Sequence, residues 1–249
     1  MTKQEMRLIV ANWKMNPETM EEARRLASRV EHGIFGSGTK GIEVAICPPF
    51  VFLPALRHYL HHVKLGSQNV SAFAKGPHTG EISALQLKVL GVRYVIVGHS
   101  ERRAMGEDDK LFNKKLLICL ENKLHPIFCV GYGTTKSTTP QAEKKIISTQ
   151  LQTALKGLRF AKDELTVAYE PAWTISKGPG TARPIAAEHA AEMISFVKKK
   201  YNKVRVIYGA SITGANCTEL ASYDAIEGGL VGGASLDGEE FLNIIKAFS

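Results

Sequence analysis

The segment Val167-Ala168-Tyr169-Glu170-Pro171-Ala172-Trp173 begins with an apolar run typical of a β-strand and continues directly into a carboxylate. The run is continuously apolar, as expected for a parallel strand that is covered on both faces. Helical periodicities separate it from similar short runs along the chain. Regular alternation of strands and helices predicts a parallel sheet. The other predicted strands are residues 8–11, 44–47, 64–65, 94–97, 126–130, 204–208 and 225–231.

Eight strand–helix units in a chain of 249 residues favour a closed (β/α)8 barrel. An open, doubly wound sheet is the structural alternative, but it usually has fewer strands. No linker divides the sequence, so we expect one α/β barrel domain over residues 1–249. Thr139-Pro140 is expected to open one of the helices, because Thr caps helices and Pro is favoured in the first turn.

The composition is 44% hydrophobic and 22% charged, which is typical of a globular protein and excludes general disorder. An excess of 32 Lys and Arg over 24 Asp and Glu favours an anionic partner. Apolar runs are too short to span a membrane, and no pattern of basic residues and aromatics indicates nucleic-acid binding. The N-terminus has no signal-peptide pattern and the four cysteines are scattered. We therefore expect a cytoplasmic protein with reduced cysteines that binds neither membranes nor nucleic acids.

Chemically capable residues follow three predicted strands. Asn12 and Lys14 follow the first strand, His99 the fourth and Glu170 the sixth. Active sites of (β/α)8 barrels lie at the carboxyl ends of the strands, so these side chains should share one rim. Glu170 could act as a general base or form a rim salt bridge, and His99 could donate to an oxyanion or be a structural histidine. Lys14 could supply fixed charge or form a Schiff base.

Glycine-rich turns follow the last two predicted strands, at Gly209-Ala210-Ser211 and Gly232-Gly233. Their backbone amides could bind a phosphate group, although a simple tight turn is the alternative. The GxGxxG match at residues 36–41 is expected to be a loop, because a helix precedes it and a strand follows it. Two of the three residues His58, His61 and His62 could share a helical face, but no carboxylate or cysteine is near them in sequence. We therefore expect no metal site.

Four separated stretches resemble the signatures of the triosephosphate isomerase family: ANWKMN at 11–16, GHSERR at 98–103, AYEPAW at 168–173 and LVGGASL at 230–236. They occur in the family's order and on the expected strand ends, and the resemblance extends from Leu8 to about Leu242. It implies a homodimeric barrel enzyme of glycolysis and gluconeogenesis that needs no cofactor. Its substrate would be a three-carbon phosphorylated sugar, with glyceraldehyde 3-phosphate and dihydroxyacetone phosphate interconverted through an enediolate.

The resemblance also implies a role for each matching residue. Glu170 would move the proton between C1 and C2, His99 would be the neutral electrophile, Lys14 its electrostatic partner and Asn12 the polar group beside it. Thr79, in the stretch 69–83, would enter the site of the neighbouring subunit. The implied phosphate-binding residues are Ser176, Ser211, Gly232 and Gly233, and the implied lid and shielding residues are Trp173, Ile175 and Leu230.

The sequence departs from the family pattern around the lid. The stretch 174–182 is one residue longer than usual, and Ser176 and Ala210 stand where the family has glycine. Tyr132 stands where a carboxylate commonly helps to hold the lid, so we expect weaker lid closure. Two alternatives to the isomerase remain: an aldolase that uses Lys14 as a Schiff base, and a non-catalytic barrel that acts as a binding protein.

Overall fold

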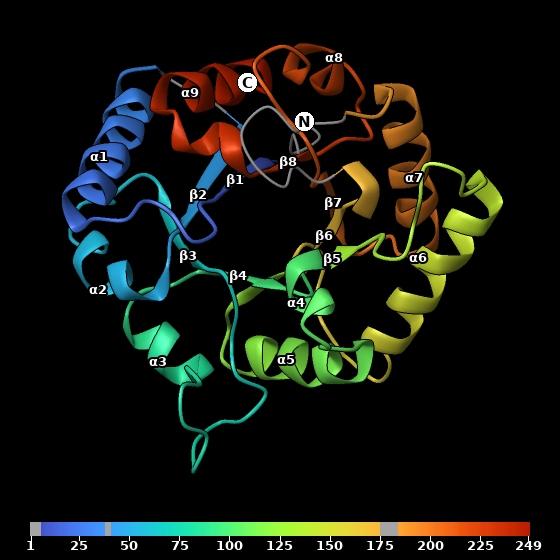
Figure 1. Cartoon of the computed structure of the whole chain (residues 1–249), viewed down its shortest axis with the longest axis horizontal. Coiled ribbons are helices and arrows are strands. Elements are labelled where there is room, and N and C mark those ends of the chain that lie inside the picture. Colours follow the sequence, from blue (N-terminus) through green and yellow to red (C-terminus); the bar gives the residue numbers. More distant parts are fainter. Residues whose placement is uncertain (1–5, 38–40, 175–183) are drawn as a thin grey trace.

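The computed structural model describes residues 6–37, 41–174 and 184–249. These residues form eight strands that close into a barrel in sequence order, and every neighbouring pair is parallel (Figure 1). Pairing of Leu8 with Gly228 and of Ala11 with Val231 closes the ring between its first and last strands. The barrel predicted from the sequence is confirmed. The strands are β1 (Arg7–Asn12), β2 (Ile42–Cys47), β3 (Lys64–Ser67), β4 (Tyr94–Val97), β5 (His125–Val130), β6 (Thr166–Tyr169), β7 (Arg205–Tyr208) and β8 (Gly228–Val231).

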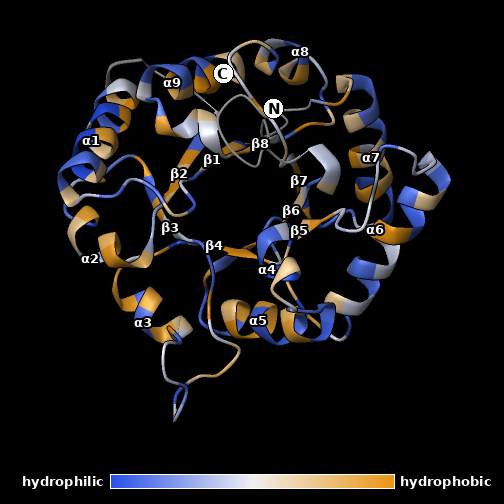
Figure 2. Cartoon of the chain, in the orientation of Figure 1, coloured by the Kyte–Doolittle hydropathy of each residue, from blue (hydrophilic) through white to orange (hydrophobic). Residues whose placement is uncertain are grey.

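Helices surround the barrel and turn their apolar faces toward it (Figure 2). Thr139 caps the helix that follows β5, where its side chain accepts a hydrogen bond from the Ala142 amide, as the sequence predicted. The helices are α1 (Met20–Ser37), α2 (Leu53–Leu56), α3 (Ala84–Val89), α4 (Ser100–Ala104), α5 (Asp109–Glu121), α6 (Pro140–Ala154), α7 (Ala187–Lys200), α8 (Cys217–Ala221) and α9 (Gly238–Ala247). Short 3-10 turns occupy η1 (Phe50–Phe52), η2 (Ala172–Thr174) and η3 (Gly233–Leu236).

The last strand starts later than predicted, at Gly228 instead of Ala225. Ile226 belongs to the preceding turn, where its amide donates to the carbonyl of Tyr223. Gly228 has a φ of +141°, and a Cβ there would lie 1.9 Å from the Leu8 carbonyl oxygen. Only glycine allows the chain to enter the barrel at this point.

The apolar residues form two layers separated by the barrel wall. Alternate residues of a strand point to opposite faces, so Leu8 and Val10 fill the barrel interior while Ile9 and Ala11 pack under the helices. All four of these side chains are fully buried. Burial on both faces explains why the strands are continuously apolar in sequence.

The helices and the cysteines of the structure bear on two further expectations from the sequence. Among the described residues, no helix combines the length and the apolar character needed to cross a bilayer. All four cysteines are buried free thiols, as expected from their scattered positions.

Candidate active site

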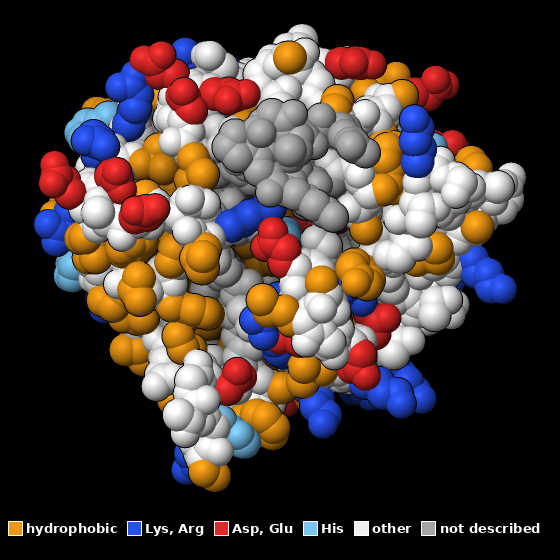
Figure 3. Space-filling model, in the orientation of Figure 1, with side chains coloured by type: hydrophobic (Ala, Val, Ile, Leu, Met, Phe, Trp, Pro, Cys, Tyr) orange, Lys and Arg blue, Asp and Glu red, His pale blue; other side chains and the backbone are white. Residues whose placement is uncertain are grey.

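The ends of β1, β4 and β6, which carry the candidate catalytic residues, meet at one end of the barrel. Asn12 is the last residue of β1, His99 is the N-cap of α4 just beyond β4, and Glu170 directly follows β6. Figure 3 shows basic, acidic and histidine side chains gathered near the centre of this face. The prediction that these residues share a rim is therefore correct.

Lys14 reaches the rim through an unusual backbone conformation. Its φ is +53°, a left-handed value that is uncommon for residues other than glycine. The Asn12 Oδ1 atom accepts a hydrogen bond of 3.1 Å from the Lys14 amide, and the Gln68 side chain donates to the Lys14 carbonyl at 2.7 Å. Asn12 thus holds the turn that carries Lys14. Strained conformations held by their surroundings are a common feature of functional sites.

Glu170 and His99 face one another inside the site. The Glu170 Oε1 atom lies 3.7 Å from His99 Nε2, and both side chains are buried. Neither carboxylate oxygen of Glu170 has a hydrogen-bond partner among the described residues. Buried polar atoms are almost always paired, so this carboxylate is free to accept a proton from a bound molecule. The Glu170 side chain packs closely against Gly209, because a Cβ at Gly209 would lie 2.7 Å from the Glu170 Cγ.

Burial raises the pKa of the Glu170 carboxyl, while the nearby His99, Cys129 and Lys14 side chains oppose the rise. A general base must be ionised, so activity should fall as the pH drops through this pKa. We expect the Glu170 pKa to lie above the usual range of a glutamate. Carbon NMR of side-chain-labelled glutamate would measure it, with Glu170→Gln assigning the resonance. A midpoint at or below that of the exposed glutamates would contradict the expected effect of burial.

The contacts of His99 fix its tautomer. The Glu101 backbone amide donates to His99 Nδ1 at 3.3 Å. Nδ1 must therefore be the acceptor, and in a neutral ring the proton lies on Nε2. That N–H points toward Glu170, where it can donate to a ligand oxygen.

Glu101, in the stretch GHSERR at 98–103, is a site residue that sequence reasoning missed. Its Oε1 atom is 2.9 Å from Lys14 Nζ, and its Oε2 atom is 3.6 Å from His99 Nδ1. It pairs with the ammonium of Lys14 and lies beside the imidazole of His99. Its position two residues after His99, in the first turn of α4, is the sequence signal that could have indicated it.

The predicted phosphate-binding residues lie beside this centre. A Cβ at Gly232 would be 3.6 Å from Lys14 Cε, and the same position on Gly233 has open space around it. The Ser211 hydroxyl donates to the Thr174 carbonyl at 2.5 Å, which ties the turn after β7 to the one after β6. Leu230 is buried inside the barrel and Trp173 is partly buried in η2. Ser176 and Ile175, with the rest of the expected lid up to residue 182, lie outside the described residues.

Thr79 is exposed in the loop between β3 and α3, which projects away from the barrel (Figure 1). The structure therefore does not bring it to the site of its own chain.

The three clustered histidines do not share a helix as the sequence suggested, because α2 ends at Leu56. A carboxylate also reaches one of them from a distant element. Glu31 of α1 accepts hydrogen bonds from His62 Nδ1 and from the amides of His62 and Val63. These contacts tie α1 to the start of β3. Within the described part of the chain, no three His, Cys, Asp or Glu residues are placed to hold a metal ion.

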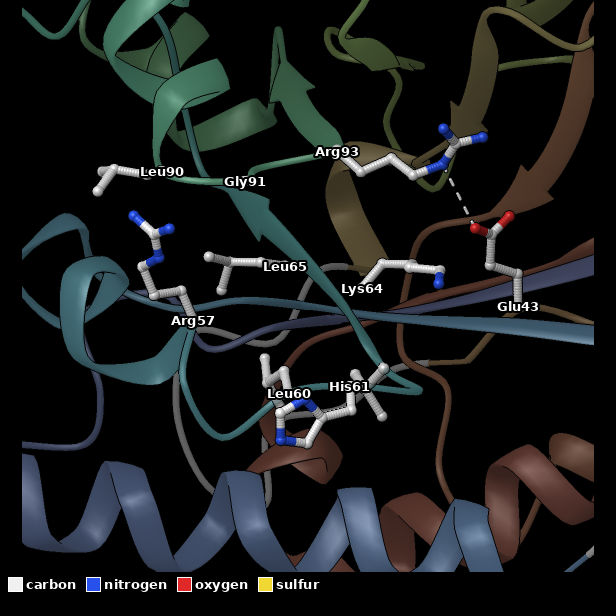
Figure 4. A pocket seen from close by; sticks show the side chains of 10 residues that line it. Glu43, Arg57, Leu60, His61, Lys64, Leu65, Leu90, Gly91 and Arg93 are labelled. Carbon is white, nitrogen blue, oxygen red and sulfur yellow. Dashed lines mark ion pairs between the residues drawn. The ribbon is translucent and has the colours of Figure 1, made fainter.

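A cavity of about 530 Å³ lies at the opposite end of the barrel (Figure 4). It is lined by Glu43 and Lys64 at the starts of β2 and β3 and by Arg93 just before β4. Glu43 is bound by Arg93 at 3.4 Å and by the Tyr94 hydroxyl at 2.6 Å. Arg57 lies at the far end of the cavity from this pair. The cavity is separate from the rim that carries Glu170.

A parallel eight-stranded barrel with a buried carboxylate, an imidazole and a lysine on its C-terminal rim defines an acid–base enzyme of the (β/α)8 class. The family model described as triosephosphate isomerase matches residues 7–248, and the chain belongs to that family.

Proteins named triosephosphate isomerase are similar over nearly the whole chain. The one from Aquifex aeolicus (strain VF5) is 40% identical, covering 97% of this chain and 99% of the relative. The one from Moorella thermoacetica (strain ATCC 39073 / JCM 9320) is 39% identical and that from Endomicrobium trichonymphae 38% identical. Each of these two comparisons covers 96% of this chain and 97% of the relative.

Proposed function

We propose that this chain, as one barrel domain, interconverts glyceraldehyde 3-phosphate and dihydroxyacetone phosphate in the cytoplasm. The observation that carries the proposal is the buried Glu170 carboxylate, whose oxygens are unpaired and lie 3.7 Å from an imidazole nitrogen. A base and a hydrogen-bond donor on opposite sides of a small site are what proton abstraction next to a carbonyl requires. Membership of the triosephosphate isomerase family supports the same substrate.

In this mechanism Glu170 removes a proton from the carbon next to the carbonyl, and the electron pair moves toward the carbonyl oxygen. His99 donates from Nε2 to that oxygen, and the Lys14 ammonium stabilises the negative charge of the enediolate. A proton then passes from the substrate hydroxyl to the former carbonyl oxygen by way of His99, and Glu170 returns its proton to the former carbonyl carbon, which completes the isomerisation. Glu101 positions Lys14 through their 2.9 Å ion pair.

The phosphate group would bind beside Lys14, at the turns after β7 and β8. Gly233 has open space on its outer side, and the backbone amides of Gly232 and Gly233 can approach a phosphate because no side chain intervenes. Ser211 would complete this part of the site, and Ser176 would add its amide from the segment outside the described residues. Leu230 and Ile175 would shield the Glu170 carboxylate from water, and Trp173 would belong to the base of the lid.

A coupled assay of glyceraldehyde 3-phosphate isomerisation with the purified protein tests this function. We expect turnover that Glu170→Gln abolishes in a protein with an unchanged circular dichroism spectrum. A folded wild-type protein without turnover would refute the enzyme assignment and favour the non-catalytic binding protein.

We further propose that the chain is a homodimer in which residues 69–83 dock onto the partner and Thr79 enters its site. Phe73 in this loop is 46% exposed and stacks on His78, with ring centroids 3.7 Å apart. An exposed apolar residue on a projecting loop is typical of an interface. Phe73→Asp should therefore produce monomers and lower kcat/KM, as measured by light scattering after gel filtration and by the coupled assay.

Phe35 offers a matched control for this substitution. It lies on α1, is 73% exposed, and also contacts a histidine, with the Phe35 and His62 ring centroids 5.1 Å apart. Phe35→Asp should leave the dimer and its activity unchanged. A monomeric wild type, or a Phe73→Asp variant that remains dimeric, would count against the proposed interface.

A further inference from the structure

A buried threonine side chain holds the backbone that directly follows Glu170. Thr134 lies in the loop after β5 and is 4% exposed. Its Oγ1 atom accepts a 3.1 Å hydrogen bond from the Ala172 amide and donates one of 2.8 Å to the Gly131 carbonyl. Pro171 has no N–H, so the Ala172 amide is the first donor after Glu170. Thr134 is its acceptor.

The loop that carries Thr134 is itself pressed against Glu170. The Glu170 amide donates to the Val130 carbonyl at 2.7 Å. A Cβ at Gly131 would lie 2.5 Å from the Glu170 carbonyl oxygen, and the φ of Gly131 is +111°. The two backbones are therefore in direct contact, and only glycine allows this approach. Any shift of the loop is transmitted to the peptide that bears the carboxylate.

The helix α6 anchors this loop. Gln150, which is 8% exposed, accepts a 2.8 Å hydrogen bond from the Gly131 amide through Oε1. It donates another of 2.8 Å from Nε2 to the Tyr132 carbonyl. A chain of buried hydrogen bonds thus runs from α6 through Gly131 and Thr134 to Ala172. Fully satisfied buried networks of this kind hold one conformation.

The sequence predicts that Tyr132 weakens lid closure, because it stands where the family commonly has a carboxylate that helps to hold the lid. The Tyr132 side chain is 38% exposed and makes no hydrogen bond or ring contact with any described residue. Thr134, two residues further on, contacts the backbone that follows Glu170.

We propose that Thr134, supported by Gln150, is a positioning residue that fixes the Glu170 carboxylate for proton transfer. The inference rests on the proposed isomerase function. Neither side chain touches the phosphate-binding turns at Ser211 and Gly232, so their loss should affect kcat and leave KM nearly unchanged. Displacement of a catalytic group by about 1 Å can cost roughly 100-fold in rate.

The test compares Thr134→Val and Thr134→Ser with the matched variant Thr166→Val. Thr166 is a buried threonine of β6 whose hydroxyl is 2.9 Å from His125 Nε2, at the other end of the same strand. Thr134→Val should lower kcat by about 10-fold or more with KM changed less than about threefold. Thr134→Ser retains the oxygen and should recover most of the rate. Thr166→Val should lower the melting temperature without this loss of kcat.

The relative kcat values of these variants decide whether Thr134 positions Glu170. The inference is overturned if Thr134→Val and Thr166→Val have the same kcat, or if Thr134→Ser loses as much rate as Thr134→Val. Should Thr134→Val fail to fold, Gln150→Met carries the test, because it removes both bonds to the loop and should lower kcat in the same way. An inactive wild type would instead refute the proposed function.

Discussion

Glu170→Asp is expected to lower kcat by about 100-fold or more while KM changes little. The substitution keeps the carboxylate but withdraws it by about 1 Å, and proton transfer depends steeply on that distance. The backbone cannot move to compensate, because Gly131 and Gly209 already pack against Glu170. The coupled isomerase assay would measure both constants.

Glu192 provides the control for this change. Its carboxylate pairs with Lys144 at 2.6 Å outside the barrel and does not touch the reacting groups, so Glu192→Asp should retain wild-type kcat. If Glu170→Asp also retains kcat within a factor of two, Glu170 is not the base.

Lys14→Met is expected to lower kcat/KM by about 100-fold to 1,000-fold, with losses in both binding and turnover. The ammonium lies beside Gly232 and is held at 2.9 Å by Glu101, so it supplies a fixed positive charge to both the phosphate and the enediolate. Removing one such donor from a preorganised site has effects of this size. Lys144→Met, which removes a half-buried lysine of α6, is the matched control. Activity of Lys14→Met near that of the control would remove Lys14 from the mechanism.

A trapping experiment on Lys14 distinguishes the isomerase from the aldolase alternative. An aldolase would form a Schiff base, and borohydride would trap the substrate on Lys14. We expect no gain in mass when wild-type protein is treated with substrate and borohydride. A covalent adduct at Lys14 would favour the aldolase.

The catalytic rim could be predicted from sequence because each of its main residues follows an apolar strand closely. Lys14, His99 and Glu170 come within two residues of the ends of β1, β4 and β6. Parallel strands in a barrel bring their carboxyl ends together whatever the separation in sequence. The apolar strand pattern, together with the rule that the carboxyl ends of parallel barrel strands meet, was therefore sufficient to place these residues on one rim.

The supporting residues could not be predicted in the same way. Thr134 and Gln150 act through contacts across 38 and 19 residues of sequence, and neither occupies a strand end. Glu31 likewise reaches His62 from α1, 31 residues earlier in the sequence. Such contacts depend on how loops and helices pack on the barrel, and strand and helix periodicity does not encode this. The late start of β8 has a similar origin, since the close approach of Leu8 to Gly228 sets it.

In the proposed mechanism, Glu170 carries a proton between adjacent carbons of the substrate. Proton NMR of the isomerisation of glyceraldehyde 3-phosphate in D₂O tests it most directly, with wild type and Glu170→Gln compared. The protonated carboxyl can exchange with solvent, so wild type should yield dihydroxyacetone phosphate that carries deuterium at C1 in part of the molecules. Glu170→Gln should show neither conversion nor labelling above the protein-free background. Conversion or labelling by Glu170→Gln at the wild-type rate would contradict this role.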